Sequence, residues 1–220
     1  MTGRRIVLFD LDDTLYAERA FLHSGWRAVA AEAGRRGLAP EVAYDMMSRS
    51  DNAFDALNRA LPEFGVDEML RIYRSHMPDI RLYEDAEEAL RLLAESGCAI
   101  GVITDGRSLT QRNKIAALSL APVLEYTGIS EETGCDKFSP EPFERAMRHF
   151  GHGNTFFYVG DNPAKDFLNP NSMGWHTVML RERESGLNIH PQRLCGLPEA
   201  ALPEFTVDSL ADVPGIVLRT

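Results

Sequence analysis

Cysteine is scarce in this sequence, with three residues in 220 and no C-x-x-C pair. The odd number and wide spacing of Cys98, Cys135 and Cys195 predict neither a disulfide framework nor a zinc site, and we expect reduced thiols. An apolar run of the roughly 18–20 residues that a membrane-spanning helix needs is also missing. The opening residues, MTGRR, lead directly into a short apolar strand, without the features of a signal peptide. We therefore expect a cytoplasmic protein with no membrane partner.

Positive charge is in short supply as well: 23 Lys and Arg residues face 33 Asp and Glu residues, for a formal net charge of −10. Binding to nucleic acid needs clustered Lys and Arg side chains, so this balance argues against a nucleic-acid partner. A small anionic substrate stays possible, because one local cation or a bound metal can override the overall field at short range. The apolar content of 44%, spread along the whole length, predicts a globular protein with a large core.

The first predicted element is a strand at Arg5–Phe9, whose continuous apolar run suits burial on both faces. After it, from about Tyr16 to Leu82, four stretches show the apolar spacing of helices and none shows the pattern of a strand. An insertion of pure helix after a single strand predicts a small helical domain over residues 16–82. Residues 1–15 and 83–220 then form the main domain.

Beyond residue 83, strands and helices alternate. Further strands are predicted at Ala99–Thr104, Tyr126–Ile129, Phe156–Gly160, His176–Leu180 and Glu204–Asp208. Asp85 with Glu88, and Ser108 with Gln111, have the spacing of capping boxes, which predicts that each pair begins a helix. The stretch at 182–203 is predicted to be loop. The alternation is typical of an α/β fold, a doubly wound and mostly parallel sheet with helices on both faces.

Polar side chains follow three of these strands. Asp10 and Asp12 come directly after the first strand, Thr104 and Asp105 end the second, and Asp161 follows the strand that ends at residue 160. Ligands of such sheets bind beyond the carboxyl ends of the strands, so we expect these side chains to converge. Carboxylates at close quarters repel one another and demand a cation. A hard divalent ion suits oxygen ligands, and Mg²⁺ fits best with a phosphate as co-ligand.

Four motifs occur in order along the chain: DLDDT from Asp10, Thr104 at a strand end, Lys137 in a polar loop, and GDNPAKD with Asp161 and Asp166. This set resembles the signature of the haloacid dehalogenase-like (HAD) superfamily, and the resemblance extends from Ile6 to about Leu180. The runs ITDGRSLTQRNKIAAL and GDNPAKDF followed by MGWHTV are similar to a phosphatase-like branch. The helical insertion resembles the C1-type cap of the superfamily. One departure is Phe138, which follows Lys137 where the family usually has proline.

The resemblance implies a Rossmann-like core and a role for each motif residue. Asp10 would attack phosphorus and form an aspartyl-phosphate. Asp12 would protonate the leaving alkoxide and then deprotonate the attacking water. Thr104 would hydrogen-bond a phosphoryl oxygen, and Lys137 would neutralise charge on the nucleophile and the phosphoryl group.

The resemblance also implies Mg²⁺ as cofactor. Its predicted ligands are Asp10, the backbone carbonyl of Asp12 and Asp161, with Asp166 as a further ligand or as support for one. The residues that follow Thr104 are candidates for contact with the substrate, namely Asp105, Gly106 and Arg107. The predicted partner is a small phosphorylated metabolite. The sequence indicates neither which ester this is nor the oligomeric state.

Other activities stay open. A phosphomutase would return the phosphoryl group from the same intermediate to the substrate. A haloacid dehalogenase would attack carbon and needs neither a metal nor a proton for the halide, so Asp12, Asp161 and Asp166 favour phosphorus. The non-enzyme alternative is a phosphate-sensing or regulatory protein, but receiver domains lack the D-x-D spacing and the helical insertion. We therefore predict a Mg²⁺-dependent phosphatase whose helical cap closes the site.

Overall fold

The computed structural model describes residues 3–183, 188–189, 192 and 194–220. Within these residues the centre of the molecule is a six-stranded sheet in the order β3-β2-β1-β4-β5-β6, and each neighbouring pair is parallel. The strands are β1 (Arg5–Phe9), β2 (Ala99–Thr104), β3 (Tyr126–Ile129), β4 (Thr155–Gly160), β5 (His176–Leu180) and β6 (Phe205–Val207). The predicted α/β fold with a doubly wound parallel sheet is confirmed.

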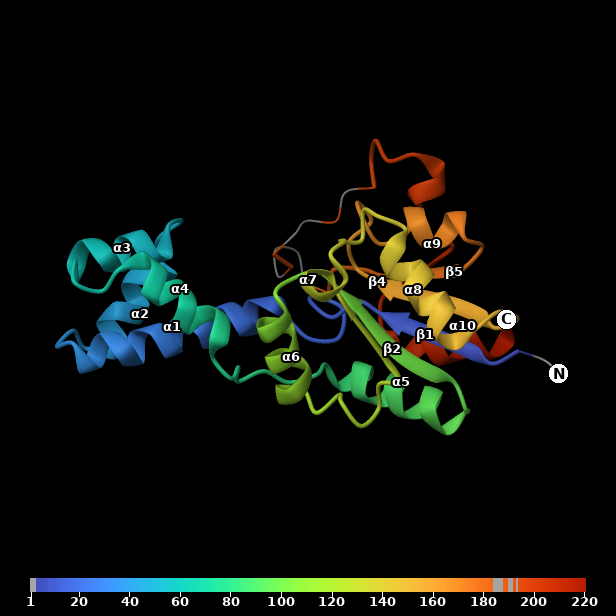
Figure 1. Ribbon diagram of the computed structural model, residues 1–220, viewed down its shortest axis with the longest axis horizontal. Coiled ribbons are helices and arrows are strands. Elements are labelled where there is room, and N and C mark those ends of the chain that lie inside the picture. The colour runs from blue at the N-terminus through green and yellow to red at the C-terminus, as the bar shows by residue number, and fades with distance from the viewer. Residues whose placement is uncertain (1–2, 184–187, 190–191, 193) are drawn as a thin grey trace.

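Helices cover both faces of the sheet (Figure 1). Successive residues of a strand point to opposite faces, so the apolar side chains of β1 divide between two cores. Val7 and Phe9 pack in one core with side chains of α5 (Glu84–Glu95), α6 (Ser108–Ala117) and α10 (Val213–Arg219). Ile6 and Leu8 pack in the other with side chains of α8 (Glu141–Phe150). Burial on both faces explains why β1 is apolar throughout.

The remaining elements of the sheet domain are short. They are α7 (Ser130–Thr133), α9 (Leu168–Ser172) and two 3₁₀ turns at Glu199–Ala201 and Leu210–Asp212. Among the described helices, none is both long and apolar enough to cross a membrane.

Four helices between β1 and α5 form a unit with a core of its own. They are α1 (Glu18–Arg35), α2 (Pro40–Ser48), α3 (Ala53–Ala60) and α4 (Val66–Ser75), packed around buried Val29, Met47, Leu57, Phe64 and Met69. In Figure 1 this unit lies at the end of the molecule opposite the two termini, on the side toward which β1 points. α6 fastens it to the sheet domain, because Thr110 and Asn113 donate hydrogen bonds to the backbone carbonyls of Arg74 and Ser75.

The expected capping boxes are wrong, although both helices begin where they were predicted. α5 begins at Glu84 and α6 at Ser108, and neither has a side-chain cap. The Gln111 amide binds Asp12 and Thr104 at the carboxyl edge of the sheet instead. Partners from distant segments outcompete the local capping contact.

Asp85, the other expected cap, connects α5 to the C-terminal part of the chain. Its carboxylate accepts hydrogen bonds from Arg183 Nη2 (2.7 and 2.9 Å), Ser209 Oγ (2.7 Å) and the Leu210 N–H (2.9 Å). Burial alone would raise the pKa of Asp85, but these donors outweigh it and hold the pKa below its usual value. The ionised carboxylate therefore stabilises the fold.

Replacing Asp85 by Asn should lower the free energy of unfolding by about 1 kcal/mol at pH 7, since the site is partly solvated. The native pKa lies below the unfolded one, so wild type holds this stability above the unfolded pKa and loses it as the pH falls through the native pKa. The deficit of Asp85→Asn should therefore shrink below about pH 4. Urea unfolding at acid and neutral pH measures it, with the exposed Asp208→Asn as control. A deficit that grows toward acid pH would contradict this account.

Candidate active site

The carboxyl ends of β1 and β4 lie side by side where the order of the strands reverses. From β1 the sheet continues through β2 to β3 on one side, and from β4 through β5 to β6 on the other. Asp10 directly follows β1, and Asp161 directly follows β4. Ligands of open α/β sheets bind at this switch point.

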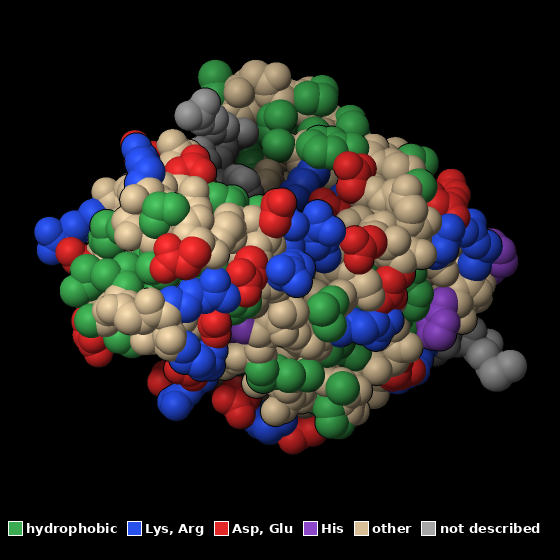
Figure 2. Space-filling model, turned by 60° about the vertical axis from the view of Figure 1, so that its left-hand side comes forward, with side chains coloured by type: hydrophobic (Ala, Val, Ile, Leu, Met, Phe, Trp, Pro, Cys, Tyr) green, Lys and Arg blue, Asp and Glu red, His purple; other side chains and the backbone are tan. Residues whose placement is uncertain are grey.

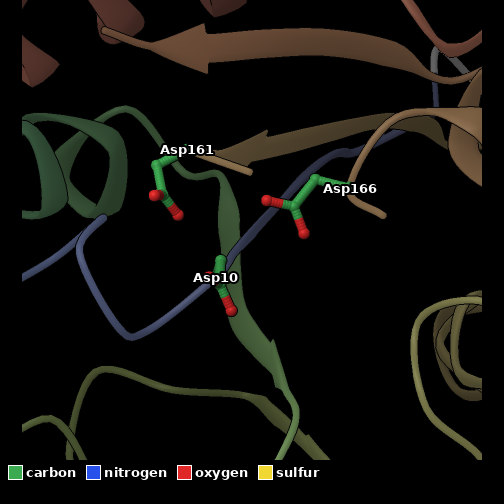
Figure 3. A group of neighbouring side chains, drawn as sticks. All are labelled: Asp10, Asp161 and Asp166. Atoms are coloured by element: carbon green, nitrogen blue, oxygen red, sulfur yellow. The ribbon is translucent and has the colours of Figure 1, made fainter. Parts of the chain in front are cut away.

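Three carboxylates from the loops after β1 and β4 point toward one another (Figure 3). Asp10, Asp161 and Asp166 are buried, and each offers an oxygen such that the three atoms lie within 4.8 Å of one another. Burial, with the charge of Asp166, raises the pKa of Asp10 to about 7. Burial, with the charges of Asp10 and Asp166, raises the pKa of Asp161 well above its usual value. Such a cluster demands positive charge.

Lys137 supplies positive charge from beneath the cluster. Its Nζ lies 2.7 Å from Asp10 Oδ1 and 2.6 Å from Asp166 Oδ1, and its side chain is 0% exposed. Burial would lower the pKa of Lys137, but the two carboxylates raise it well above its usual value, so the ammonium stays charged. Phe138, in the place of the usual proline, is 67% exposed. The departure from the family pattern therefore leaves Lys137 in the site.

The loop after β4 holds Asp166 against the strand. The Asn162 N–H donates to Asp166 Oδ2 (2.8 Å), and the Asp166 N–H donates to the Asn162 carbonyl (3.0 Å). Gly160 makes this approach possible, because a Cβ there would lie 2.5 Å from Asp166 Oδ2. A glycine at the end of β4 is thus required for the carboxylate to reach Lys137.

Asp12 has a different set of partners. Its carboxylate accepts hydrogen bonds from Lys114 Nζ (2.7 Å), Gln111 Nε2 (2.9 Å) and the Tyr16 hydroxyl. Burial alone would raise the pKa of Asp12, but Lys114 and the hydrogen bonds lower it below its usual value. Asp12 is therefore ionised at neutral pH, and its carboxylate is engaged away from the three-carboxylate cluster.

Thr104 belongs to the same network as Asp12. Gln111 Nε2 lies 2.6 Å from Thr104 Oγ1 and donates to it, as it does to Asp12. Because the threonine oxygen accepts this bond, its own hydroxyl hydrogen is available to another acceptor. Thr104 is buried at the end of β2, one residue before Asp105.

The three residues predicted to meet the substrate do not stay together. Asp105 lines the cavity at the carboxyl edge, together with Thr104. Gly106 and Arg107 are exposed and do not line it. The guanidinium of Arg107 lies 3.8 Å from the carboxylate of Glu131 instead.

The cavity at this edge has a volume of about 120 Å³. It is lined by Asp10, Asp12, Asp13, Glu18, Thr104, Asp105, Asp161, Asn162 and Lys165. Glu18 comes from the first turn of α1, and burial, with the charges of Asp12 and Asp13, raises the pKa of Glu18 to about 8. Figure 2 shows acidic and basic side chains interleaved over the face that brings the four-helix unit forward. The concentration of carboxylates in the cavity is therefore local.

The residues of this site that sequence reasoning missed include Tyr16, Glu18, Gln111, Lys114 and Lys165. Gln111 and Lys114 are three residues apart on α6, a spacing that places them on one face of a helix. That spacing was a usable signal, as was the position of Lys165 directly before Asp166. The contacts of Tyr16 and Glu18 depend on the turn after Asp10, which has no regular period.

The carboxylate cluster fits a Mg²⁺ ion. Three carboxylate oxygens are the hard donors that Mg²⁺ prefers, and it commonly takes few protein carboxylates together with substrate phosphate and water. Among the residues that the structure describes, the side chains that donate to Asp161 are neutral, namely Thr14 Oγ1 (3.3 Å) and Asn188 Nδ2 (2.9 Å). The charge of Asp161 is thus left for a cation.

Residues 7–180 match the family of haloacid dehalogenase-like hydrolases. The chain belongs to this family. The hydrolase is 27% identical to the glyceraldehyde 3-phosphate phosphatase of Methanopyrus kandleri, over 97% of both chains. The resemblance drawn from the motifs is confirmed, and the chain is an enzyme of the hydrolase class.

Two solved structures show how widely the fold of this hydrolase is shared. The HAD-hydrolase YfnB from Bacillus subtilis bound to magnesium superimposes with a TM-score of 0.65 at 17% identity, covering 99% of both chains. The 2-haloacid dehalogenase from Pseudomonas syringae pv. Tomato DC3000 has a TM-score of 0.65 at 22% identity and covers 98% of this chain and 99% of its own. The fold alone therefore does not separate attack on phosphorus from attack on carbon.

Replacing Lys114 by Met should raise the pKa of Asp12, because a close opposite charge is removed from a buried carboxylate. The ionised form would then be lost at a higher pH than in wild type. Carbon-13 NMR titration of the aspartate carboxyl groups, with Asp12→Asn for assignment, measures the shift. Arg112→Met is the matched control, since Arg112 lies on the same helix but pairs with Glu132 at the surface. An unchanged titration in Lys114→Met would contradict the account.

Proposed function

We propose that this hydrolase is a Mg²⁺-dependent phosphatase that cleaves a small phosphorylated metabolite through an aspartyl-phosphate on Asp10. The observation that carries the proposal is the cluster of Asp10, Asp161 and Asp166, with the ammonium of Lys137 between two of its members. The cluster offers hard oxygen ligands to Mg²⁺ at the point where the nucleophile stands. Bound Mg²⁺ would stabilise the ionised carboxylates and the charge on the phosphoryl oxygens.

In the first step Asp10 attacks phosphorus. A bond forms between its carboxylate oxygen and phosphorus, and the bond from phosphorus to the ester oxygen breaks. Lys137 keeps the nucleophile in place and neutralises charge that would otherwise repel the substrate. The Thr104 hydroxyl, whose oxygen already accepts from Gln111, donates its hydrogen to a phosphoryl oxygen.

In the second step water attacks the aspartyl-phosphate, phosphate leaves and Asp10 is restored. Asp12 takes the proton from this water, and the hydrogen bonds from Lys114, Gln111 and Tyr16 favour the ionised form that a base requires. The first step needs Asp12 in its protonated form, so that the ester oxygen leaves as an alcohol. The proton that Asp12 takes from water in one turnover is the one it donates in the next. Protonation of Asp12 weakens its attraction to Lys114, and the carboxyl group is then free to turn toward the leaving group.

Phosphorus is favoured over carbon by two features of the site. A halide leaves without a proton, so a dehalogenase has no use for Asp12, which here lies in the same cavity as Asp10. A dehalogenase also does not use a metal, whereas the three-carboxylate cluster here offers the oxygen ligands that a metal ion would bind. Hydrolysis is favoured over phosphoryl transfer to a second substrate group by the family, which is described as one of hydrolases, and by relatives named as phosphatases.

We propose further that residues 16–82 form a cap over the domain made of residues 1–15 and 83–220. Glu18 of α1 supports this assignment, because the four-helix unit thereby contributes a side chain to the cavity. The cavity of about 120 Å³ suits a phosphoryl group with a small leaving group. The relative from Methanopyrus kandleri, named for a three-carbon phosphate ester, points to the same class of substrate.

A phosphate-release screen over small phosphate esters with Mg²⁺ tests the proposal. Wild type should release phosphate, and Asp10→Asn should lose activity by at least about 10³-fold, because it removes the attacking oxygen's charge. Chelation of divalent ions should abolish release and added Mg²⁺ restore it. Asp208→Asn, which changes an exposed carboxylate that does not line the cavity, should match wild type.

Three results would contradict the proposal. If wild type and Asp10→Asn release phosphate equally, the assignment of Asp10 as nucleophile is wrong. If activity is full under chelation, the assignment of a metal cofactor is wrong. If the protein releases halide from a panel of haloacids and no phosphate from the esters, it attacks carbon and is a dehalogenase.

A further inference from the structure

Lysine is rare in this chain and confined to one place. Only three of the 23 Lys and Arg residues are lysine, and the other 20 are arginine. All three lysines pair with carboxylates at the carboxyl edge of the sheet: Lys114 with Asp12, Lys137 with Asp10 and Asp166, and Lys165 with Asp105. Arginine serves as the cation of the molecular surface. This distribution singles out Lys165 in the same way as it does Lys137.

The three lysines differ in whether a ligand can reach them. The side chain of Lys137 is 0% exposed and lies between two carboxylates. The side chain of Lys114 is 4% exposed, with its Nζ on Asp12 and 4.3 Å from the centre of the Phe21 ring. Lys165 is 23% exposed and lines the cavity. Among the described residues that line this cavity, it is the only cation.

A phosphate ester that enters the cavity meets strong negative charge. Six of its nine lining residues are carboxylates. Lys165 and Asp10, the proposed nucleophile, line the same cavity. An ammonium near Asp10 and open to the cavity is placed to receive a phosphoryl oxygen.

Asp105 and the loop after β4 hold Lys165 in this position. Asp105 Oδ2 accepts from Lys165 Nζ (3.1 Å), and Asp105 Oδ1 accepts from the backbone N–H of Lys137 (3.1 Å). The loop turns at Asn162, whose carbonyl accepts from the Lys165 N–H (3.2 Å). Asp105 thus connects the segment that carries Lys137 to the loop after β4 that carries Lys165. Its own negative charge makes its carboxylate a poor partner for a phosphate.

We infer that Lys165 is a second phosphoryl-binding cation of the site and that Asp105 positions it. The inference rests on the proposed phosphatase function and adds a substrate contact to it. It also assigns Asp105, expected to touch the substrate, to the placement of the lysine that does.

The test compares Lys165→Met, Lys165→Arg and Asp105→Asn with wild type, using p-nitrophenyl phosphate as substrate and inorganic phosphate as competitive inhibitor. Lys165→Met should raise both the KM and the inhibition constant of phosphate by at least about tenfold, as expected for loss of a charged hydrogen bond. Lys165→Arg should recover part of this loss, and Asp105→Asn should raise the inhibition constant of phosphate several-fold. Arg145→Met removes a cation on α8 outside the cavity and should match wild type.

The double variant Asp105→Asn with Lys165→Met separates substrate contact from simple neutralisation of Asp105. If Lys165 only balances Asp105, removal of both charges restores the KM and the inhibition constant, and the inference is overturned. If Lys165 binds the phosphoryl group, the double variant stays as weak as Lys165→Met. Circular dichroism checks that each variant is folded.

The two proposals fail in different ways. If wild type releases phosphate and folded Lys165→Met has the same KM and the same inhibition by phosphate, the role of Lys165 is overturned. The proposed phosphatase function is then unaffected. Wild type that releases no phosphate from any ester overturns both.

Discussion

The site depends on the ion pairs that Lys137 makes with Asp10 and Asp166. A parallel sheet whose strand order reverses brings the ends of β1 and β4 together, and the loops that follow them carry carboxylates. Buried carboxylates within 4.8 Å of one another would destabilise the fold strongly if nothing opposed their charge. Lys137, fully buried, opposes two of them, and under the proposed function Mg²⁺ would oppose the third, Asp161. These buried ion pairs are explained by function more than by stability, because apolar side chains of similar volume would stabilise the fold as much.

That constraint extends into the surrounding elements. Gly160 has no side chain that would clash with Asp166, and the turn at Asn162 holds Asp166 by one hydrogen bond to its carboxylate and one from its backbone N–H. On the other side Gln111 bridges Thr104 and Asp12, so α6 is docked by the site as much as by its apolar contacts. The same helix holds the four-helix unit through Thr110. A movement of that unit therefore acts on the helix that positions Asp12.

The sequence predicted most of the fold and the centre of the site, for a physical reason. Strands buried on both faces are apolar throughout, and a carboxylate directly after such a strand must lie at the edge of the sheet, as Asp10 and Asp161 do. Contacts between residues far apart in the sequence could not be predicted from it. Lys114 meets Asp12 across 102 residues of chain, and Asp85 meets Arg183 across 98, where it does not cap its helix. α10 follows the last strand in residues whose short apolar run has no clear period, and it was not predicted.

The three lysines divide the electrostatic work of the site. Lys137 pairs with Asp10, the proposed nucleophile, Lys114 pairs with Asp12, and Lys165 lines the cavity while paired with Asp105. An ammonium is compact and can sit between two oxygens at 2.6 and 2.7 Å, as at Lys137, whereas a planar guanidinium needs room for its fork. This explains why a chain that has arginine at 20 of its 23 Lys and Arg positions has lysine at position 137, where space is tight. It also explains why so acidic a chain can accept an anion. These three side chains offset the carboxylates locally, and the proposed Mg²⁺ would offset them further, so the net charge of −10 has little bearing on the cavity.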